Sequence, residues 1–94
     1  MIYPQGKSSG VITSSAAINS APGRVLGVMI LAGADAASVQ IKDGGSSGTA
    51  VTVAISVGAG NFDYVSFNNG IQCSTSIYAT ITGTTPDVVV IYED

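Results

Sequence analysis

The stretch GRVLGVMILAGADAASVQIKDGGSSGTAV, residues 23–51, decides the fold, because it joins apolar runs by glycine-rich turns and carries almost no side chain able to perform chemistry. Its first run, Val25 to Leu31, is apolar at odd and even positions alike, which is typical of a central strand or of a strand covered on its second face by a neighbour. Its second run alternates apolar and polar residues from Ser38 to Lys42, which is typical of a half-buried strand. The stretch therefore predicts β-structure.

The rest of the chain repeats this two-residue period. Apolar residues alternate with small or polar ones over residues 51–57 and again over residues 77–82, and Val88 to Ile91 is apolar at both parities. Residues 11–18 could form a short helix around two alanines, but their β-branched residues favour a strand. No segment shows a convincing helical repeat, so the pattern predicts strands throughout.

Turn residues separate these runs at short intervals. The sharpest signal is Asn69-Gly70, because a type I′ turn requires positive φ at both central residues and this dipeptide tolerates it best. We expect it to join a strand ending near Phe67 to one starting at Ile71. About seven or eight short strands without helices predict an all-β fold, a single antiparallel β-sandwich of the jelly-roll or immunoglobulin-like type over residues 11–94. A small closed β-barrel is the alternative.

Length and composition bound the class of protein. The 94 residues suffice for one domain, and 46% hydrophobic with 10% charged residues indicates a folded chain. The longest apolar run, Val25 to Ala34, is far shorter than the ~20 residues that cross a bilayer, and residues 1–10 lack the apolar core of a secretory signal. We therefore expect a soluble protein made in a cytoplasm, with no membrane partner.

The scarcity of charge, histidine and cysteine excludes several functions. A net charge of −3 with three cations provides no basic patch, so we expect no nucleic-acid partner. One cysteine and no histidine allow neither a disulfide framework nor a four-ligand zinc site. Cys73 shares its parity with Ile71 and is predicted to be a small buried hydrophobe rather than a nucleophile. No cofactor and no metal are expected.

Candidate catalytic groups lack the partners that their chemistry needs. Asp35, Asp43, Asp63 and Asp87 stand in or beside turns and are interpreted as turn formers and solubilising charges. A calcium site or a glycosidase pair would need a motif or a cleft that the sequence does not display. The serines and threonines have no activating base, and residues 44–48 lack the lysine of a phosphate-binding loop. We expect no enzyme, and a hydrolase using the aspartates is the remaining enzymatic hypothesis.

Three aromatic residues, Phe62, Tyr64 and Phe67, lie close together in the sequence. Aromatic residues in strands usually pack in the core or on a sheet face. A carbohydrate platform would need several coplanar rings, which this spacing does not establish.

Four segments carry a resemblance to a known group of proteins: GRVLGVMILAG from Gly23, V-x-I-x-D-G over residues 39–44, V-x-F-x-N-G-I ending at Ile71, and I-T-G-T-x-x-D-V-x-V-x-Y over residues 81–92. From Pro22 to Tyr92 the chain resembles small all-β proteins encoded among the virion genes of tailed bacteriophages. The resemblance implies a structural protein of the virion, made in the host cytoplasm and placed on the head surface. Its expected role is that of a capsid decoration (cement) protein that bridges major capsid subunits. The alternative is a neck, tail or fibre component that contacts other virion proteins or host glycans.

The sequence also predicts self-association and an N-terminal arm. A small core and few charges leave more hydrophobic surface than a monomer of this size hides, which predicts a homo-oligomer; the resemblance favours a trimer. Residues 1–10 show no alternation and are predicted to form an N-terminal arm. In this arm Ile2 and Tyr3 are predicted to dock on a neighbouring subunit, Pro4 to stiffen the exit, and Lys7 to meet an acidic patch on the partner. A frayed terminus without a role is the alternative.

Overall fold

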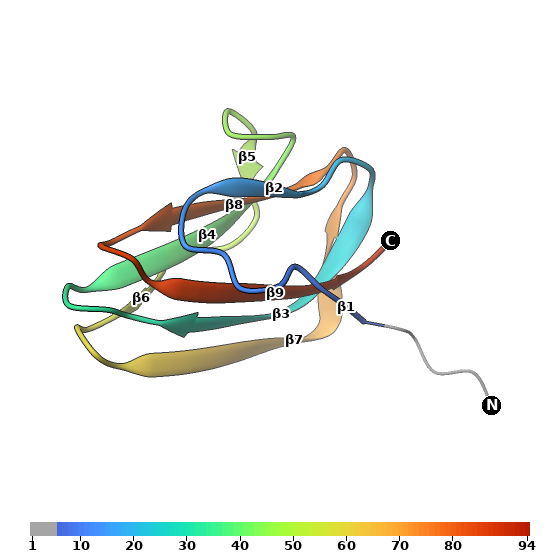
Figure 1. Ribbon diagram of the computed structural model, residues 1–94. Coiled ribbons are helices and arrows are strands. Elements are labelled where there is room, and N and C mark those ends of the chain that lie inside the picture. The colour runs from blue at the N-terminus through green and yellow to red at the C-terminus, as the bar shows by residue number, and fades with distance from the viewer. Residues whose placement is uncertain (1–5) are drawn as a thin grey trace.

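The computed structural model describes residues 6–94, which form two antiparallel β-sheets packed face to face without a helix (Figure 1). Sheet A has the order β1 (Lys7–Ser8), β9 (Asp87–Glu93), β3 (Gly23–Leu31), β7 (Phe62–Cys73). Sheet B has the order β2 (Ala16–Asn19), β8 (Ile77–Thr82), β4 (Ala37–Asp43), and beside β4 it holds both β5 (Thr49–Ala50) and β6 (Ile55–Val57). The predicted all-β antiparallel sandwich is confirmed, and the two separate sheets do not close into a barrel.

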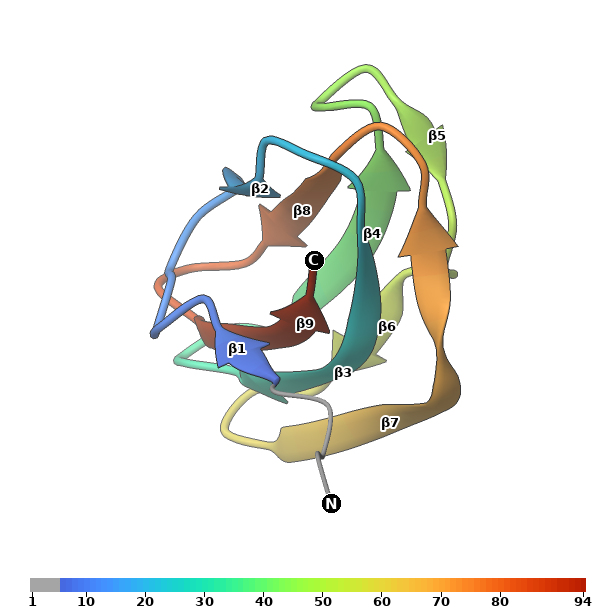
Figure 2. The same cartoon turned by 90° about the vertical axis from the view of Figure 1, so that its right-hand side faces the viewer.

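The strand order is that of a jelly roll. With β5 and β6 taken as one interrupted strand, sheet A holds the first, eighth, third and sixth strands, and sheet B the second, seventh, fourth and fifth. Every connection except the one from β4 to β5 passes from one sheet to the other, as Figure 2 shows in a second view. The third and fourth strands thus run beside the eighth and seventh, which is how a jelly roll wraps around its core.

The core lies between the two sheets and is filled by alternate residues of their central strands. The predicted alternation is confirmed in β4 and β8, where Val39, Ile41, Ile77 and Ala79 are fully buried. Val28 and Val90 fill the facing positions of sheet A, and Cys73 is buried with them, as predicted. No charged side chain is buried among residues 6–94.

The predicted strand over residues 51–57 is wrong over residues 51–54, because β5 ends at Ala50 and β6 begins at Ile55. The Thr52 side chain replaces a backbone carbonyl as hydrogen-bond acceptor for β4, because its Oγ1 accepts the backbone N–H of Ile41 at 3.0 Å. The Gln40 amide donates to the Thr52 carbonyl at 3.1 Å. Side-chain bonds of this kind compete with backbone pairing, and Val53 is left 78% exposed.

The predicted hairpin turn at Asn69-Gly70 is also wrong, because β7 runs through it without reversing. Gly70 does adopt positive φ, 75°, but at a large bulge in which residues 67–70 face the single residue Leu26 of β3. The strand bends there (Figure 2). Arg24 holds the bend, since its Nη1 donates to the Asn69 carbonyl at 3.1 Å and its aliphatic stem occupies the space where a Gly70 Cβ would lie.

Sheet A begins earlier than the boundary we predicted at residue 11. Lys7 and Ser8 pair with Tyr92 and Ile91, and the Ser9 N–H donates to the Val90 carbonyl at 2.9 Å. These residues lack alternation because a short edge strand pairs through its backbone, which any side chain permits. Residues 1–5 of the predicted arm lie outside the described residues.

Candidate functional site

The outer face of sheet A is mostly apolar, although the register also places Asp87 opposite Leu31 and Ser66 opposite Gly27 on it. The register places Leu31 opposite Phe62, Met29 opposite Tyr64 on one side and Val89 on the other, and Gly27 opposite Ile91. Directly paired residues point to the same side of a sheet, so their side chains share the face that points away from sheet B. We call these six side chains the apolar face: Leu31, Met29, Phe62, Tyr64, Val89 and Ile91. Leu31 is 43% exposed, and Phe62 and Tyr64 are each 53% exposed.

Gly27 shapes the centre of the apolar face. A Cβ at this position would lie 3.2 Å from both Cε1 and Oη of Tyr64, which is closer than most real Cβ contacts. The absence of a side chain therefore lets the Tyr64 ring approach the backbone of β3. The Tyr64 ring thus lies against Gly27 and extends from β7 onto β3.

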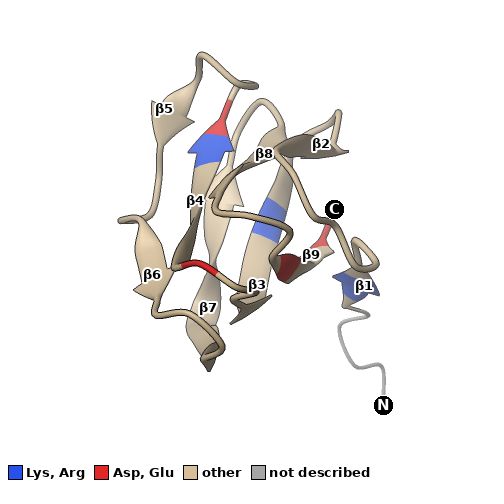
Figure 3. Ribbon diagram, turned by 60° about the vertical axis from the view of Figure 1, so that its left-hand side comes forward, with Lys and Arg blue, Asp and Glu red and all other residues tan. Residues whose placement is uncertain are grey.

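The outer face of sheet B is polar by contrast. The Ser38 and Thr82 hydroxyl oxygens are 2.6 Å apart and share a hydrogen bond across β4 and β8, and Gln40 stands opposite Thr80. Lys42, one of three cations in the chain, lies on the same face. Figure 3 shows how few charged residues the ribbon carries. A face of several clustered apolar side chains marks an interaction surface, and of the two outer faces only that of sheet A fits this description.

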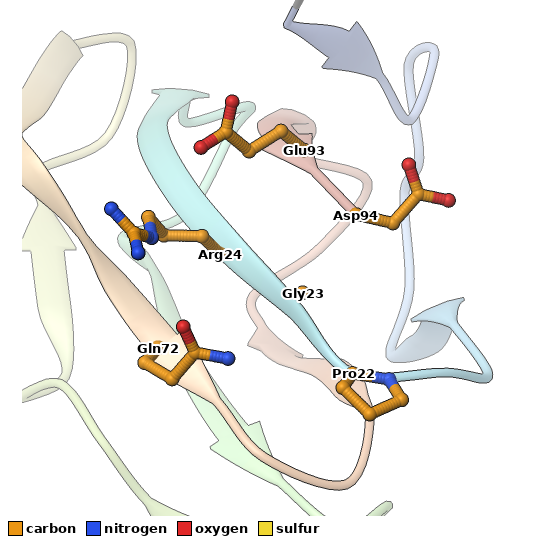
Figure 4. A pocket seen from close by; sticks show the side chains of 6 residues that line it. All are labelled: Pro22, Gly23, Arg24, Gln72, Glu93 and Asp94. Carbon is orange, nitrogen blue, oxygen red and sulfur yellow. The ribbon is translucent and has the colours of Figure 1, made fainter. Parts of the chain in front are cut away.

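A polar hollow lies at one end of sheet A (Figure 4). Its volume is about 280 Å³ and it is lined by Pro22, Gly23, Arg24, Gln72, Glu93 and Asp94. Arg24 stands opposite Gln72 and Glu93 in the register, so the hollow continues the outer face of sheet A beyond its apolar part. No lining residue offers a nucleophilic hydroxyl or thiol. The hollow forms a charged margin beside an apolar centre, as protein–protein interfaces commonly have.

The aspartates considered as catalytic candidates lie in different parts of the sandwich. Asp43 accepts three backbone N–H groups from residues 74–76, and these bonds hold the pKa of its carboxyl below the ordinary value. Asp35 accepts the Thr84 hydroxyl at 2.7 Å. Asp63 lies in β7 and Asp87 begins β9. Within residues 6–94 no group of three acidic, histidine or cysteine side chains is placed to hold a metal ion. Asp43 supports a turn, as predicted, whereas Asp35 bonds only to a side chain and Asp63 and Asp87 stand within strands.

The predicted partner-binding residues are only partly described. Lys7 forms an ion pair with Asp94 of its own chain at 2.8 Å, and this pairing raises the pKa of the lysine. Ile2, Tyr3 and Pro4 lie outside the described residues. Gly6 enters the sheet beside the apolar face, where a Cβ on it would lie 3.3 Å from Cγ2 of Ile91.

Sequence reasoning missed the apolar face itself. The available signal was Val25 to Leu31, because a strand apolar at both parities needs cover on both sides. In the described part of the chain sheet B covers its inner side, and no element covers its outer side.

No protein-family model, curated protein or solved structure matches this chain. None of the described residues forms a helix long and apolar enough to span a bilayer.

Proposed function

We propose that this chain is a non-enzymatic structural protein of a tailed-bacteriophage virion, a decoration protein that binds assembled heads and bridges neighbouring major capsid subunits. The observation that carries this proposal is the apolar face, because half-exposed Leu31, Phe62 and Tyr64 on one sheet need a protein partner to be covered. The virion context comes from the resemblance carried by residues 22–92. The fold alone assigns no function, since jelly rolls serve many.

The size of the apolar face suits attachment to a repeated surface. Fully burying a large apolar side chain contributes roughly 1.5–3 kcal/mol. The side chains of Leu31, Phe62 and Tyr64 are already about half covered within the chain itself. Each copy therefore gains only a modest free energy from this face. A bridging position or an oligomer engages several such faces at once, and simultaneous engagement multiplies weak contacts into stable attachment.

The difference between the two outer faces predicts how the protein is oriented on the capsid. Sheet A faces the capsid in this proposal, and the polar face of sheet B, with Ser38, Gln40 and Lys42, faces solvent. Ile2, Tyr3 and Pro4 supply a second contact to a neighbouring subunit. Lys7 is not assigned a partner contact, since it pairs with Asp94.

Co-sedimentation with heads that lack the protein tests the proposal. The wild-type chain is expected to bind to saturation, and Leu31→Ser, which removes a 43% exposed side chain from the apolar face, is expected to bind less tightly. Val53→Ser is the matched control. Val53 is 78% exposed, but it lies between β5 and β6 of sheet B and is not part of the apolar face. Equal binding by all three proteins would contradict the role of the apolar face.

Electron microscopy of labelled protein on virions separates the two structural roles. Label over the whole head supports a decoration protein. Label confined to the portal vertex, tail or fibres would support the neck, tail or fibre alternative. Absence of binding to any part of the virion would overturn both.

A further inference from the structure

Strand β7 forms an edge of sheet A that differs from the other sheet edges. It spans 12 residues and, within residues 6–94, pairs only with β3. The other edge strands are short, two residues in β1, four in β2, two in β5 and three in β6. Short edges are a common protection against unwanted pairing, and β7 lacks this protection.

The hydrogen bonds fix which backbone groups of β7 point outward. The Ala32 N–H donates to the Asn61 carbonyl at 2.9 Å, so odd-numbered residues at the start of β7 turn their backbone groups toward β3. The bonds on the other side of β3 are consistent with this assignment. Val88 of β9 bonds to Ile12, so the backbone groups of even-numbered residues of β9 point away from β3. The N–H and C=O groups of Phe62, Tyr64 and Ser66 therefore point away from β3, along the open edge.

We infer that β7 pairs antiparallel with β7 of a second copy about a twofold axis, with Tyr64 opposite the partner's Tyr64 and Phe62 opposite the partner's Ser66. The two A sheets then form one continuous sheet, and the exposed rings of Phe62 and Tyr64 meet across the new junction. Aromatic residues next to each other on adjoining strands stabilise such a junction. This inference concerns self-association and does not rest on the proposed virion role.

The register follows from bonding and charge. Centred on Tyr64, the pairing uses Phe62, Tyr64 and Ser66 of both copies, and each pair exchanges two N–H···O bonds. Centred on Asp63, it would use only Phe62 and Tyr64. That second register would also place two Asp63 carboxylates directly opposite each other, which destabilises a strand pair. The Tyr64 register sets Asp63 opposite Val65 instead.

A second copy fits this edge because the straight part of β7, residues 62–66, is centred on Tyr64. It is bounded by the turn at residues 58–61 and by the bulge at residues 67–70. Asp63 is its only charged residue, so charge repulsion is confined to one position that the register can avoid. A twofold dimer departs from the trimer that the resemblance favours, and the mass of the assembly in solution distinguishes the two.

Sedimentation of wild type, Ser66→Pro and Ser66→Ala provides the first test. Proline at residue 66 removes an N–H that points outward and leaves the bonds to β3 intact, as proline in edge strands generally does. We expect wild type and Ser66→Ala to be dimers, and Ser66→Pro to be a monomer with the circular dichroism of the wild type. A wild-type monomer, a wild-type trimer or a folded dimeric Ser66→Pro would overturn the inference.

Disulfide trapping provides a second test that does not depend on proline. Tyr64→Cys places two thiols directly across the axis, where Cα atoms of a hydrogen-bonded pair are about 5.5 Å apart, within the range of a disulfide. Ser66→Cys is the matched control on the same edge, because the Tyr64 register separates its two copies by four residues, roughly 14 Å. Mild oxidation should give covalent dimers with Tyr64→Cys and not with Ser66→Cys. No cross-link with Tyr64→Cys, or equal cross-linking of both variants, would overturn the register.

Discussion

The carboxylate of Asp43, at the end of β4, accepts the backbone N–H of Thr75 at 2.9 Å. It also accepts the N–H of Ser74 at 2.9 Å, the N–H of Ser76 at 3.2 Å and the Ser74 hydroxyl at 3.1 Å. Residues 74–76 connect β7 in sheet A to β8 in sheet B. One side chain thus supplies acceptors for a whole turn at the end of the sandwich, where backbone donors would otherwise need water.

Asp43→Asn is expected to lower the free energy of unfolding. An asparagine amide has one acceptor oxygen and presents N–H donors where the turn already has donors, so it cannot replace the carboxylate. Denaturant unfolding at pH 7 measures the effect. Asp35→Asn is the control, because Asp35 accepts only one side-chain hydroxyl in the structure, from Thr84. A loss for Asp35→Asn as large as that for Asp43→Asn would contradict the capping role.

The stability that Asp43 provides should depend on pH. Its pKa is lowered from the ordinary 3.8 by backbone N–H groups, chiefly that of Thr75. A carboxyl whose pKa is lower in the folded state stabilises the fold above its unfolded pKa, and this stabilisation is lost as the pH falls through its folded pKa. The stability difference between wild type and Asp43→Asn is therefore expected to be constant from pH 7 to about 5 and to shrink below pH 3.8. Asp94 also has a lowered pKa but is present in both proteins, so it cancels. A difference that persists undiminished at pH 2 would contradict this prediction.

Gly70→Ala should destabilise the chain through both conformation and contact. Positive φ costs a residue with a side chain about 1–2 kcal/mol, and a Cβ at residue 70 would collide with Cγ and Cδ of Arg24. Gly60→Ala is the matched control, since Gly60 has a similar φ of 73° with no atom within 4 Å of the added Cβ. We expect the larger loss for Gly70→Ala in thermal unfolding.

The Arg24 contact can be isolated by a double variant. Removing the Arg24 stem should make Gly70→Ala less damaging in an Arg24→Ala background than in the wild type. An unchanged effect of Gly70→Ala in the two backgrounds would mean that conformation alone accounts for the loss.

The bend of β7 at Gly70 could be predicted only in part from the sequence. Asn69-Gly70 indicated positive φ at both residues, and Gly70 has it but Asn69 does not. A hairpin and a bulge both accommodate a glycine at positive φ, and the side chain that contacts the bulge belongs to Arg24, which is 45 residues away in the chain. Burial in β4 and β8 was predictable because it depends on side-chain alternation alone, which is a local property.

The candidate site was less predictable than the fold for a related reason. Val25 to Leu31 correctly indicated a strand apolar on both faces, but not which element covers each face. That depends on strand order, which places β3 in the middle of sheet A with sheet B on one side only. Phe62 and Tyr64 were recognised as candidates for sheet-face packing, and only the register sets them beside Leu31 and Met29.

Cys73 should be protected from thiol reagents in the folded protein. It is fully buried, and burial, followed by the charge of Asp43, raises the pKa of its thiol. Both effects lower the amount of accessible thiolate, which is the form that reacts. With an aromatic disulfide reagent at pH 8, we expect the native chain to react no faster than it opens, and the chain in denaturant to react at once with its one thiol. Val53→Cys serves as the positive control, since a side chain at this 78% exposed position should react immediately in the native protein. Rapid native labelling of Cys73 would show that the end of β7 opens readily, and would contradict its place in the packed core.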